Sequence, residues 1–201
     1  MKLVLATNNR HKIEEITAIL KDLDVTILTK DDFSDFPDPD ETGSTLEENA
    51  ILKAREIFDH TGVPSLADDS GIEVDALGGD PGVNSARYAG PGCTFADNNR
   101  KLLKALESVP REKRTARFRC VIAICFDNDN IELAEGRVDG VVTSEVRGKE
   151  GFGYDPIFEI PDLSLTFAEM PPEKKHSMSH RGRALEKARI LIREYLEKSG
   201  K

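Results

Sequence analysis

The chain contains few of the residues that build cross-linked or membrane-spanning proteins. Its 201 residues include three cysteines and no tryptophan. Because the number of cysteines is odd and no Cys-x-x-Cys spacing occurs, the sequence disfavours a disulfide framework and a zinc site. Cys120 and Cys125 lie in an apolar run and are expected to be packing residues. No run approaches the ~18–20 apolar residues of a membrane helix, and the chain opens on a strand pattern instead of a signal peptide. We therefore expect a cytoplasmic protein.

Positive charge is also scarce. Lysine and arginine number 28 against 37 acidic residues, which gives a formal net charge of −9. Such a balance argues against a nucleic-acid partner, and the missing apolar run argues against a membrane partner. The chain has no GxxxxGK[ST] motif, and Gly151-Phe152-Gly153 begins a GxGxxG that lacks its third glycine. These absences exclude a P-loop and leave a Rossmann dinucleotide site unsupported.

The periodicity of apolar residues predicts an α/β fold with a mixed central sheet and flanking helices. Strand patterns cover Lys2–Ala6, Val25–Leu28, Ile72–Val74, Arg117–Phe126 and Ile131–Val142. Helical patterns follow Ile13–Leu23, a capping box at Ser44–Glu47, a second capping box at Thr94–Asp97, and His180 to about Lys198. The glycine- and proline-bearing segments Asp31–Gly43, Gly78–Gly92 and Gly148–Phe158 are predicted to be loops.

Two predicted helix starts carry cations where carboxylates are usual. Asn8–Lys12 and Ser179–Arg183 both place a capping residue ahead of basic side chains. Each such cation costs about 0.3–1 kcal/mol against the helix dipole. A phosphate chain, held by free backbone N–H groups and the cations, would remove the conflict. Asn9 and Lys12 are therefore candidate phosphate contacts, with an ordinary solvated helix start as the alternative.

The segment Asp68-Asp69-Ser70-Gly71 is the strongest local signal. Adjacent carboxylates at a strand end repel each other unless they are solvated or neutralised, and Mg²⁺ prefers such oxygen ligands. Neighbouring strand side chains point to opposite faces, so we expect only one of the two to reach a reacting centre. Glu41, in an acidic loop, could supply a further ligand. A solvated Asx turn and an ordinary acidic loop remain the alternatives.

A third candidate region places two aromatic residues among glycines, at Gly151–Pro156. An aromatic ring there could stack on a nucleobase for roughly 1–3 kcal/mol, whereas a tight turn with core aromatics is the alternative. A second basic cluster, which could also be a solvated helix start, contains Lys174, Lys175, His180, Arg181 and Arg183. We do not expect His180 to be a nucleophile.

Five motifs in order resemble the inosine triphosphate pyrophosphatase family, whose members act on non-canonical purine nucleoside triphosphates. They are Thr7-x-Asn9-x-x-Lys12, Leu66–Gly71, Ala76–Gly82 with Ser85–Tyr88, Gly151–Pro156, and Ser179–Arg181. The resemblance is collinear from Leu3 to about Leu191, nearly the whole chain.

The resemblance implies a single domain over residues 1–201, with two lobes around a nucleotide cleft, that forms a homodimer. It also implies Mg²⁺-dependent hydrolysis of ITP, dITP and XTP between the α and β phosphates, which cleanses the nucleotide pool. By position, Glu41 and Asp69 would bind the metal, and Asp69 would accept the proton of the attacking water. The implied substrate contacts are Thr7, Asn8, Asn9, Arg10, His11, Lys12, Ser70, Phe152, Gly153, Tyr154, Asp155, Lys175, His180 and Arg181. A nucleotide-binding sensor without catalysis and a hydrolase for standard or pyrimidine nucleotides remain open.

Overall fold

A computed structural model describes residues 1–200 of the chain, which divides into two compact units. Unit 1 comprises Met1–Asp69, Cys120–Gly136 and Arg181–Lys201, and unit 2 comprises Ser70–Arg119 and Arg137–His180. Each unit has its own cluster of buried apolar residues.

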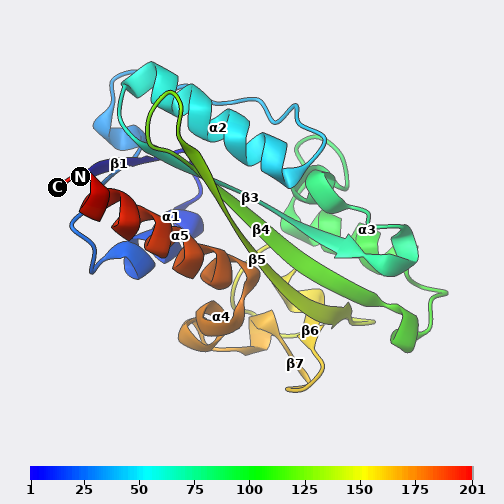
Figure 1. Ribbon diagram of the computed structural model, residues 1–201. Coiled ribbons are helices and arrows are strands. Elements are labelled where there is room, and N and C mark those ends of the chain that lie inside the picture. The colour runs from blue at the N-terminus through cyan, green and yellow to red at the C-terminus, as the bar shows by residue number, and fades with distance from the viewer. Residues whose placement is uncertain (201) are drawn as a thin grey trace. The chain divides into compact units, whose positions relative to one another are not determined.

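Within residues 1–200, seven strands form one sheet in the order β2-β1-β3-β4-β5-β6-β7 (Figure 1). The strands are β1 (Lys2–Leu5), β2 (Thr26–Leu28), β3 (Ser65–Val74), β4 (Thr115–Cys125), β5 (Ile131–Val142), β6 (Phe158–Ile160) and β7 (Leu165–Thr166). The α-helices are α1 (Arg10–Leu20), α2 (Leu46–Thr61), α3 (Phe95–Ala105), α4 (Pro172–Met178) and α5 (His180–Lys198). Because β1 pairs in parallel with β2 and β3 while β6 pairs antiparallel with β5 and β7, the sheet is mixed. The predicted α/β class is confirmed.

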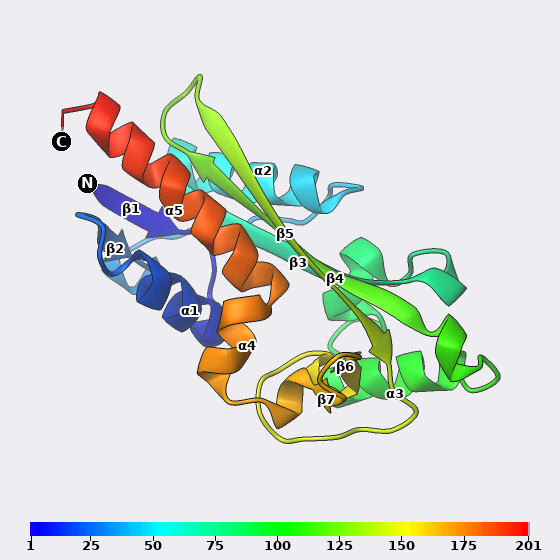
Figure 2. The same ribbon diagram turned by 60° about the horizontal axis from the view of Figure 1, so that its bottom comes forward.

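The helices of unit 1 cover both faces of its strands, with α1 and α5 on one face and α2 on the other (Figures 1 and 2). Leu66 of β3 packs in the same cluster as residues of α1 and α5. Its neighbour Ser65 points the other way and donates a hydrogen bond from Oγ to the Ala54 carbonyl of α2 at 2.5 Å. Side chains along β3 therefore alternate between the two faces, as the period of two requires.

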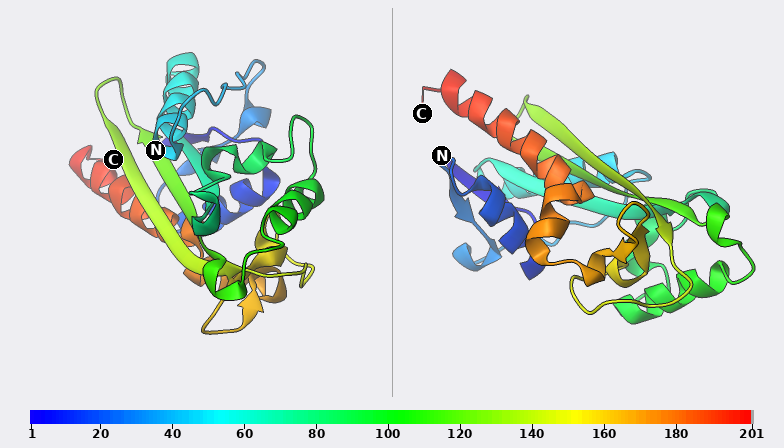
Figure 3. Two further views of the ribbon diagram at one scale, coloured as in Figure 1. Left: turned by 90° about the vertical axis from the view of Figure 1, so that its right-hand side faces the viewer. Right: turned by 90° about the horizontal axis from the view of Figure 1, so that it is seen from below.

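Unit 2 is built around aromatic packing. The rings of Phe118 and Phe158 lie 4.5 Å apart, and those of Phe158 and Phe167 lie 5.4 Å apart. Phe118 comes from the long hairpin of β4 and β5 (Figure 3). The core of this unit supports the loop from Thr143 to Pro156, which lies between β5 and β6 in the chain.

Three local predictions from the sequence differ from the structure. First, β3 continues without a break through Asp68–Gly71, which were expected to leave the strand. Gly71 permits this, because a Cβ there would collide with the Gly82 carbonyl oxygen and only glycine fits. Second, the cap of α2 is Thr45, whose Oγ1 accepts from the Glu48 N–H at 3.1 Å, so the predicted cap is wrong by one residue. Third, β6, β7 and α4 were missed, because segments of two to seven residues show too little periodicity.

Candidate functional site

Asp68 and Asp69 lie inside β3, just beyond the point where its parallel neighbour ends. The last residue of β1, Leu5, pairs with Leu66, so both carboxylates come after the carboxyl end of β1. This is where ligands bind in open α/β sheets. The two residues are only 2% and 6% exposed, which rules out a solvated turn.

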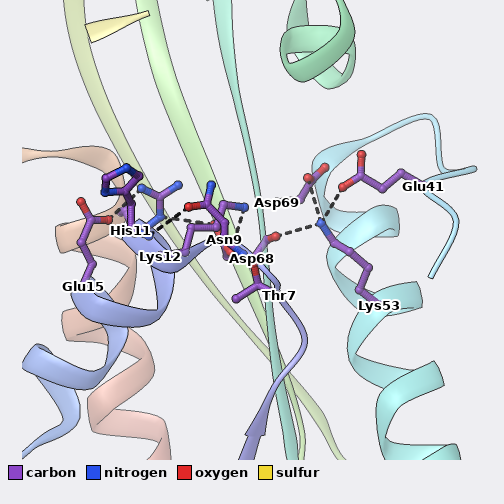
Figure 4. A network of polar contacts seen from close by, with 10 residues as sticks. Thr7, Asn9, His11, Lys12, Glu15, Glu41, Lys53, Asp68 and Asp69 are labelled. Atoms are coloured by element: carbon purple, nitrogen blue, oxygen red, sulfur yellow. Dashed lines mark hydrogen bonds and ion pairs between the residues drawn. The ribbon is translucent and has the colours of Figure 1, made fainter. Parts of the chain in front are cut away.

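The alternation along β3 turns Asp68 toward α1 and α5. Lys12 of α1 has its Nζ 3.0 Å from Asp68 Oδ1 (Figure 4), and Arg181 of α5 has its Nε 3.3 Å from Oδ2. Arg181 also pairs with Glu15 of α1, at 2.8 Å from Nη1 to Oε2. Burial alone would raise the pKa of Asp68, but the charges of Lys12 and Arg181 outweigh it and hold the pKa well below its usual range.

These contacts change the interpretation of the two cationic helix starts. The sequence suggested that an outside anion would balance them, whereas Asp68 and Glu15 supply internal carboxylates. Lys12 is still partly exposed, and Arg181 is only 4% exposed. The phosphate contact assigned to each stays a prediction. Of the two, Lys12 has the more open position.

Asp69 turns the opposite way, toward α2, where it meets a buried lysine. Lys53 Nζ donates to Asp69 Oδ1 at 3.1 Å and to Glu41 Oε1 at 2.8 Å (Figure 4). The same ammonium donates to the Asp68 carbonyl oxygen at 2.9 Å. Asn49 Nδ2 donates to Asp69 Oδ2 at 3.3 Å. Glu41, which could have been a free loop carboxylate, is therefore tied to Asp69 through one cation.

The electrostatics of this trio follow from burial. Burial alone would lower the pKa of Lys53, but Asp69, Asp68 and Glu41 outweigh it and raise the pKa, so the lysine is charged. Burial raises the pKa of Asp69, and Glu41 adds to the rise against the attraction of Lys53. A carboxylate with a raised pKa is a better proton acceptor near neutral pH.

Lys53 was missed by the sequence reasoning, although a signal was present. It falls at helical spacing with Leu46, Ala50 and Ile57, all buried. A lysine on the apolar stripe of a helix is buried only when partnered. The position of Lys53 on this stripe could therefore have indicated that it has an acidic partner.

The start of α1 has the predicted cap. Asn9 Oδ1 accepts from the His11 N–H at 3.0 Å, and Thr7 Oγ1 accepts from the Asn9 N–H at 3.2 Å. Asn8, Arg10 and His11 are exposed. No acidic residue lies in the first turn, so the positive end of the helix dipole is open to an anion.

The oxygen atoms around Lys53 suit a divalent cation. Glu41 and Asp69 direct carboxylate oxygens at one point, and hard ions such as Mg²⁺ take that donor type. Within residues 1–200, no three or more His, Cys, Asp or Glu side chains group in a way that could hold a metal. Two carboxylates with remaining water ligands is a common Mg²⁺ arrangement, so the residues fit this ion.

The remaining predicted contacts lie in unit 2. Asp155 Oδ2 accepts from the Phe152 N–H at 2.8 Å and from Lys175 Nζ at 2.7 Å. The same ammonium lies 4.8 Å from the centre of the Phe152 ring. Asn99 of α3 donates to the Gly153 carbonyl at 3.0 Å. Phe152 is half-buried and forms part of the wall of a pocket of about 520 Å³, whose apolar lining also includes Phe95, Leu103, Val146 and Pro156.

Tyr154 and His180 are core residues of unit 2. Tyr154 is buried, and its hydroxyl donates to the Ser85 carbonyl at 2.8 Å, as the alternative of a core aromatic expected. His180 stacks on Phe118, with ring centres 4.6 Å apart. Ser70 is half-buried in β3. Lys175 and Asp155 form the ion pair next to the Phe152 ring, and Tyr154 anchors the loop through its hydrogen bond to Ser85.

Gly151 gives a direct test of how this loop is built. Its φ is +73°, and a Cβ there would collide with the Asp155 carboxylate. We expect Gly151→Ala to destabilise the fold by about 1–3 kcal/mol from backbone strain, with the collision added. Gly153→Ala is the matched control, because φ is +64° there and nothing lies within 4 Å of the new Cβ. Thermal unfolding should place Gly151→Ala below Gly153→Ala, and equal losses would mean that the Asp155 contact does not constrain the loop.

These features define a class of protein: an α/β fold in which buried carboxylates paired with cations follow the end of a parallel strand, beside an anion-accepting helix start. The Ham1 family model matches residues 3–190, and the chain belongs to the Ham1 family. This agrees with the resemblance found in the sequence.

Two curated relatives and one solved structure illustrate the similarity. The dITP/XTP pyrophosphatase of Thioalkalivibrio sulfidiphilus is 55% identical, over 96% of this chain and 97% of its own length. The dITP/XTP pyrophosphatase of Desulforamulus reducens is 52% identical, over 98% of both chains. The solved HAM1 protein from Coxiella burnetii superposes with a TM-score of 0.90 at 44% identity, covering 96% of this chain and 99% of that one.

The length and apolar character of the helices show whether any of them could span a membrane. Between residues 1 and 200, none combines the length and the apolar character needed to cross a bilayer.

Proposed function

We propose that this protein hydrolyses ITP, dITP and XTP to the monophosphate and pyrophosphate, with Mg²⁺ as cofactor, and so removes deaminated purines from the nucleotide pool. The main observation is that the carboxylates of buried Asp69 and partly exposed Glu41 meet at one cation position. Curated relatives named dITP/XTP pyrophosphatase support the substrate class.

In unit 1, the residues provide a base and positive charge. Asp69 takes the proton of the attacking water, for which its raised pKa suits it. Lys12 and the positive end of the α1 dipole hold the phosphates and stabilise the leaving pyrophosphate. Glu41 and Asp69 would hold Mg²⁺, which polarises phosphoryl oxygen and lowers the pKa of bound water. Catalysis then rests on positioning and charge neutralisation, as in other phosphoryl transfers.

In unit 2, the residues offer a surface for the base. We expect the Phe152 ring to stack on the purine. Donors such as Lys175, His180 or the backbone amides nearby can pair with the 6-carbonyl of hypoxanthine or xanthine. Adenine presents an amino group there, which would leave buried donors unpaired and would be rejected strongly.

We propose further that the protein acts in the cytoplasm as a homodimer. The cytoplasmic location follows from the substrate, since deaminated triphosphates arise in the nucleotide pool. The dimer rests on the family resemblance, and sedimentation equilibrium measures it directly.

The reaction product and the base preference test this function together. We expect Mg²⁺-dependent release of pyrophosphate, with ITP, dITP and XTP turned over at least about 10²-fold faster than ATP, because a site that hydrogen-bonds a substrate group can reject an analogue that cannot pair by about 10⁴–10⁵-fold. The measurement is pyrophosphate and orthophosphate release from ITP, XTP, dITP, GTP, ATP and dTTP. Orthophosphate as the product would mean that cleavage does not occur between the α and β phosphates. Tight ITP binding without turnover would instead indicate a nucleotide sensor, and equal rates on dTTP a broader hydrolase.

A further inference from the structure

The ammonium of Lys53 lies at the point where the carboxylates of Glu41 and Asp69 meet. Its Nζ is 2.8 Å from Glu41 Oε1 and 3.1 Å from Asp69 Oδ1 (Figure 4). The third oxygen around it is the Asp68 carbonyl, at 2.9 Å. The three donors of an ammonium are thus matched by three oxygen acceptors.

Lys53 and Asp69 are buried in this arrangement, whereas Glu41 is partly exposed. Lys53 is 8% exposed and Asp69 is 6% exposed, so neither charge is well solvated. A buried charge that loses its partner is strongly destabilising. The lysine therefore balances part of the charge of the two carboxylates from within the fold.

From this geometry we propose that Lys53 is an internal counter-cation that competes with the divalent metal for Glu41 and Asp69. The inference rests on the proposed function in one respect, that these two carboxylates are the metal ligands. Two cations cannot share the same carboxylate oxygens at close range without strong repulsion in a poorly solvated site. Lys53 must therefore withdraw its ammonium when the metal is bound, and the side chain has the length and flexibility for this.

The competition sets both the stability of the protein without metal and its affinity for metal. Without metal, Lys53 holds Glu41 and Asp69 together and keeps the site assembled. With metal, part of the binding free energy is spent on displacing the lysine. Removing the ammonium should therefore weaken the metal-free fold and tighten metal binding.

The experiment compares wild type, Lys53→Met and Lys12→Met without nucleotide. Lys12→Met is the matched control, because it removes the same charge from the same unit but from the ion pair with Asp68. Calorimetric titration with Mg²⁺ or Mn²⁺ should show that Lys53→Met binds about tenfold more tightly than wild type or better. The affinity of Lys12→Met for the metal should increase clearly less. Thermal unfolding in a chelator should be lower for Lys53→Met than for wild type, and saturating Mg²⁺ should close that difference.

Two outcomes overturn the inference. Equal gains in both variants would mean that only net charge matters, and an unchanged or weaker affinity in Lys53→Met would mean that the lysine does not compete. If Lys53→Met fails to fold, ¹⁵N NMR of the lysine ammonium groups in the wild-type protein tests whether Mg²⁺ displaces Lys53. The Lys53 signal should lose its hydrogen-bond protection as Mg²⁺ is added, and a signal unchanged at saturation refutes displacement.

Failure of the proposed function would be seen separately. Pyrophosphate release by the wild-type protein tests the function, whereas the metal titration uses no nucleotide. The counter-cation can therefore be right in a protein that does not hydrolyse ITP, and wrong in one that does.

Discussion

Asp69→Asn is expected to reduce pyrophosphate release by about 10²–10⁴-fold, the contribution of a positioned general base, and loss of a metal ligand would add to it. The asparagine has nearly the same shape and can still accept a hydrogen bond from Lys53, so the fold should survive. The measurement is the rate with ITP at saturating Mg²⁺, with circular dichroism and thermal unfolding to check the fold.

Asp22→Asn is the matched control for this prediction. Asp22 lies in the same unit, and its ion pair with Arg189 is at the surface. That variant should keep the wild-type rate. If Asp69→Asn also kept it, the proton acceptor would have to be another residue and the proposed mechanism would fail.

Arg181→Met is expected to cause the largest loss of stability. Arg181 is buried between Asp68 and Glu15, and removing it leaves two buried carboxylates without that partner. Breaking a buried ion pair typically costs about 3–5 kcal/mol, which for a chain of this length lowers the melting temperature by about 6–20 °C. Thermal unfolding at neutral pH measures the loss.

Arg189→Met in the same helix separates charge burial from helix effects. Arg189 pairs with Asp22 and Glu186 at the surface, and exposed pairs contribute about 0–1 kcal/mol. The loss in Arg181→Met should be partly recovered when Glu15→Gln is added, because one buried charge is then removed. A melting temperature like that of Arg189→Met would show that the Arg181 contacts do not hold the fold.

The long periodic elements could be predicted from the sequence because a local sequence signal was sufficient to identify each of them. The helix from His180 to Lys198 and the cap at Thr94 agree with the structure, since an amphipathic stripe or a capping box is a local signal. The continuity of β3 could not be predicted. Asp-Asp-Ser-Gly is a turn sequence by local preference, whereas in the folded protein it is a strand whose carboxylates pair with Lys12, Arg181 and Lys53.

In the candidate site, too, local features could be predicted from the sequence and tertiary contacts could not. Asp68 and Asp69 could be identified from their adjacency, and their opposite directions from the period of two. Which residues pair with them could not be predicted, because Glu15, Lys53 and Arg181 come from helices distant in sequence, and the position of Lys53 on an apolar stripe indicates an acidic partner without identifying it. For the same reason the two cationic helix starts could be noticed as an anomaly, but the internal carboxylates that balance them could not be seen.

The three cysteines give each unit its own chemical reporter. Cys120 and Cys125 are buried in unit 1, and Cys93 is half-buried in unit 2. A thiol reagent modifies a buried cysteine only when the surrounding structure opens. In a Cys93→Ser background, labelling rates of Cys120 and Cys125 would therefore report opening of the unit that holds Asp69, and ligand protection could be followed there through natural cysteines.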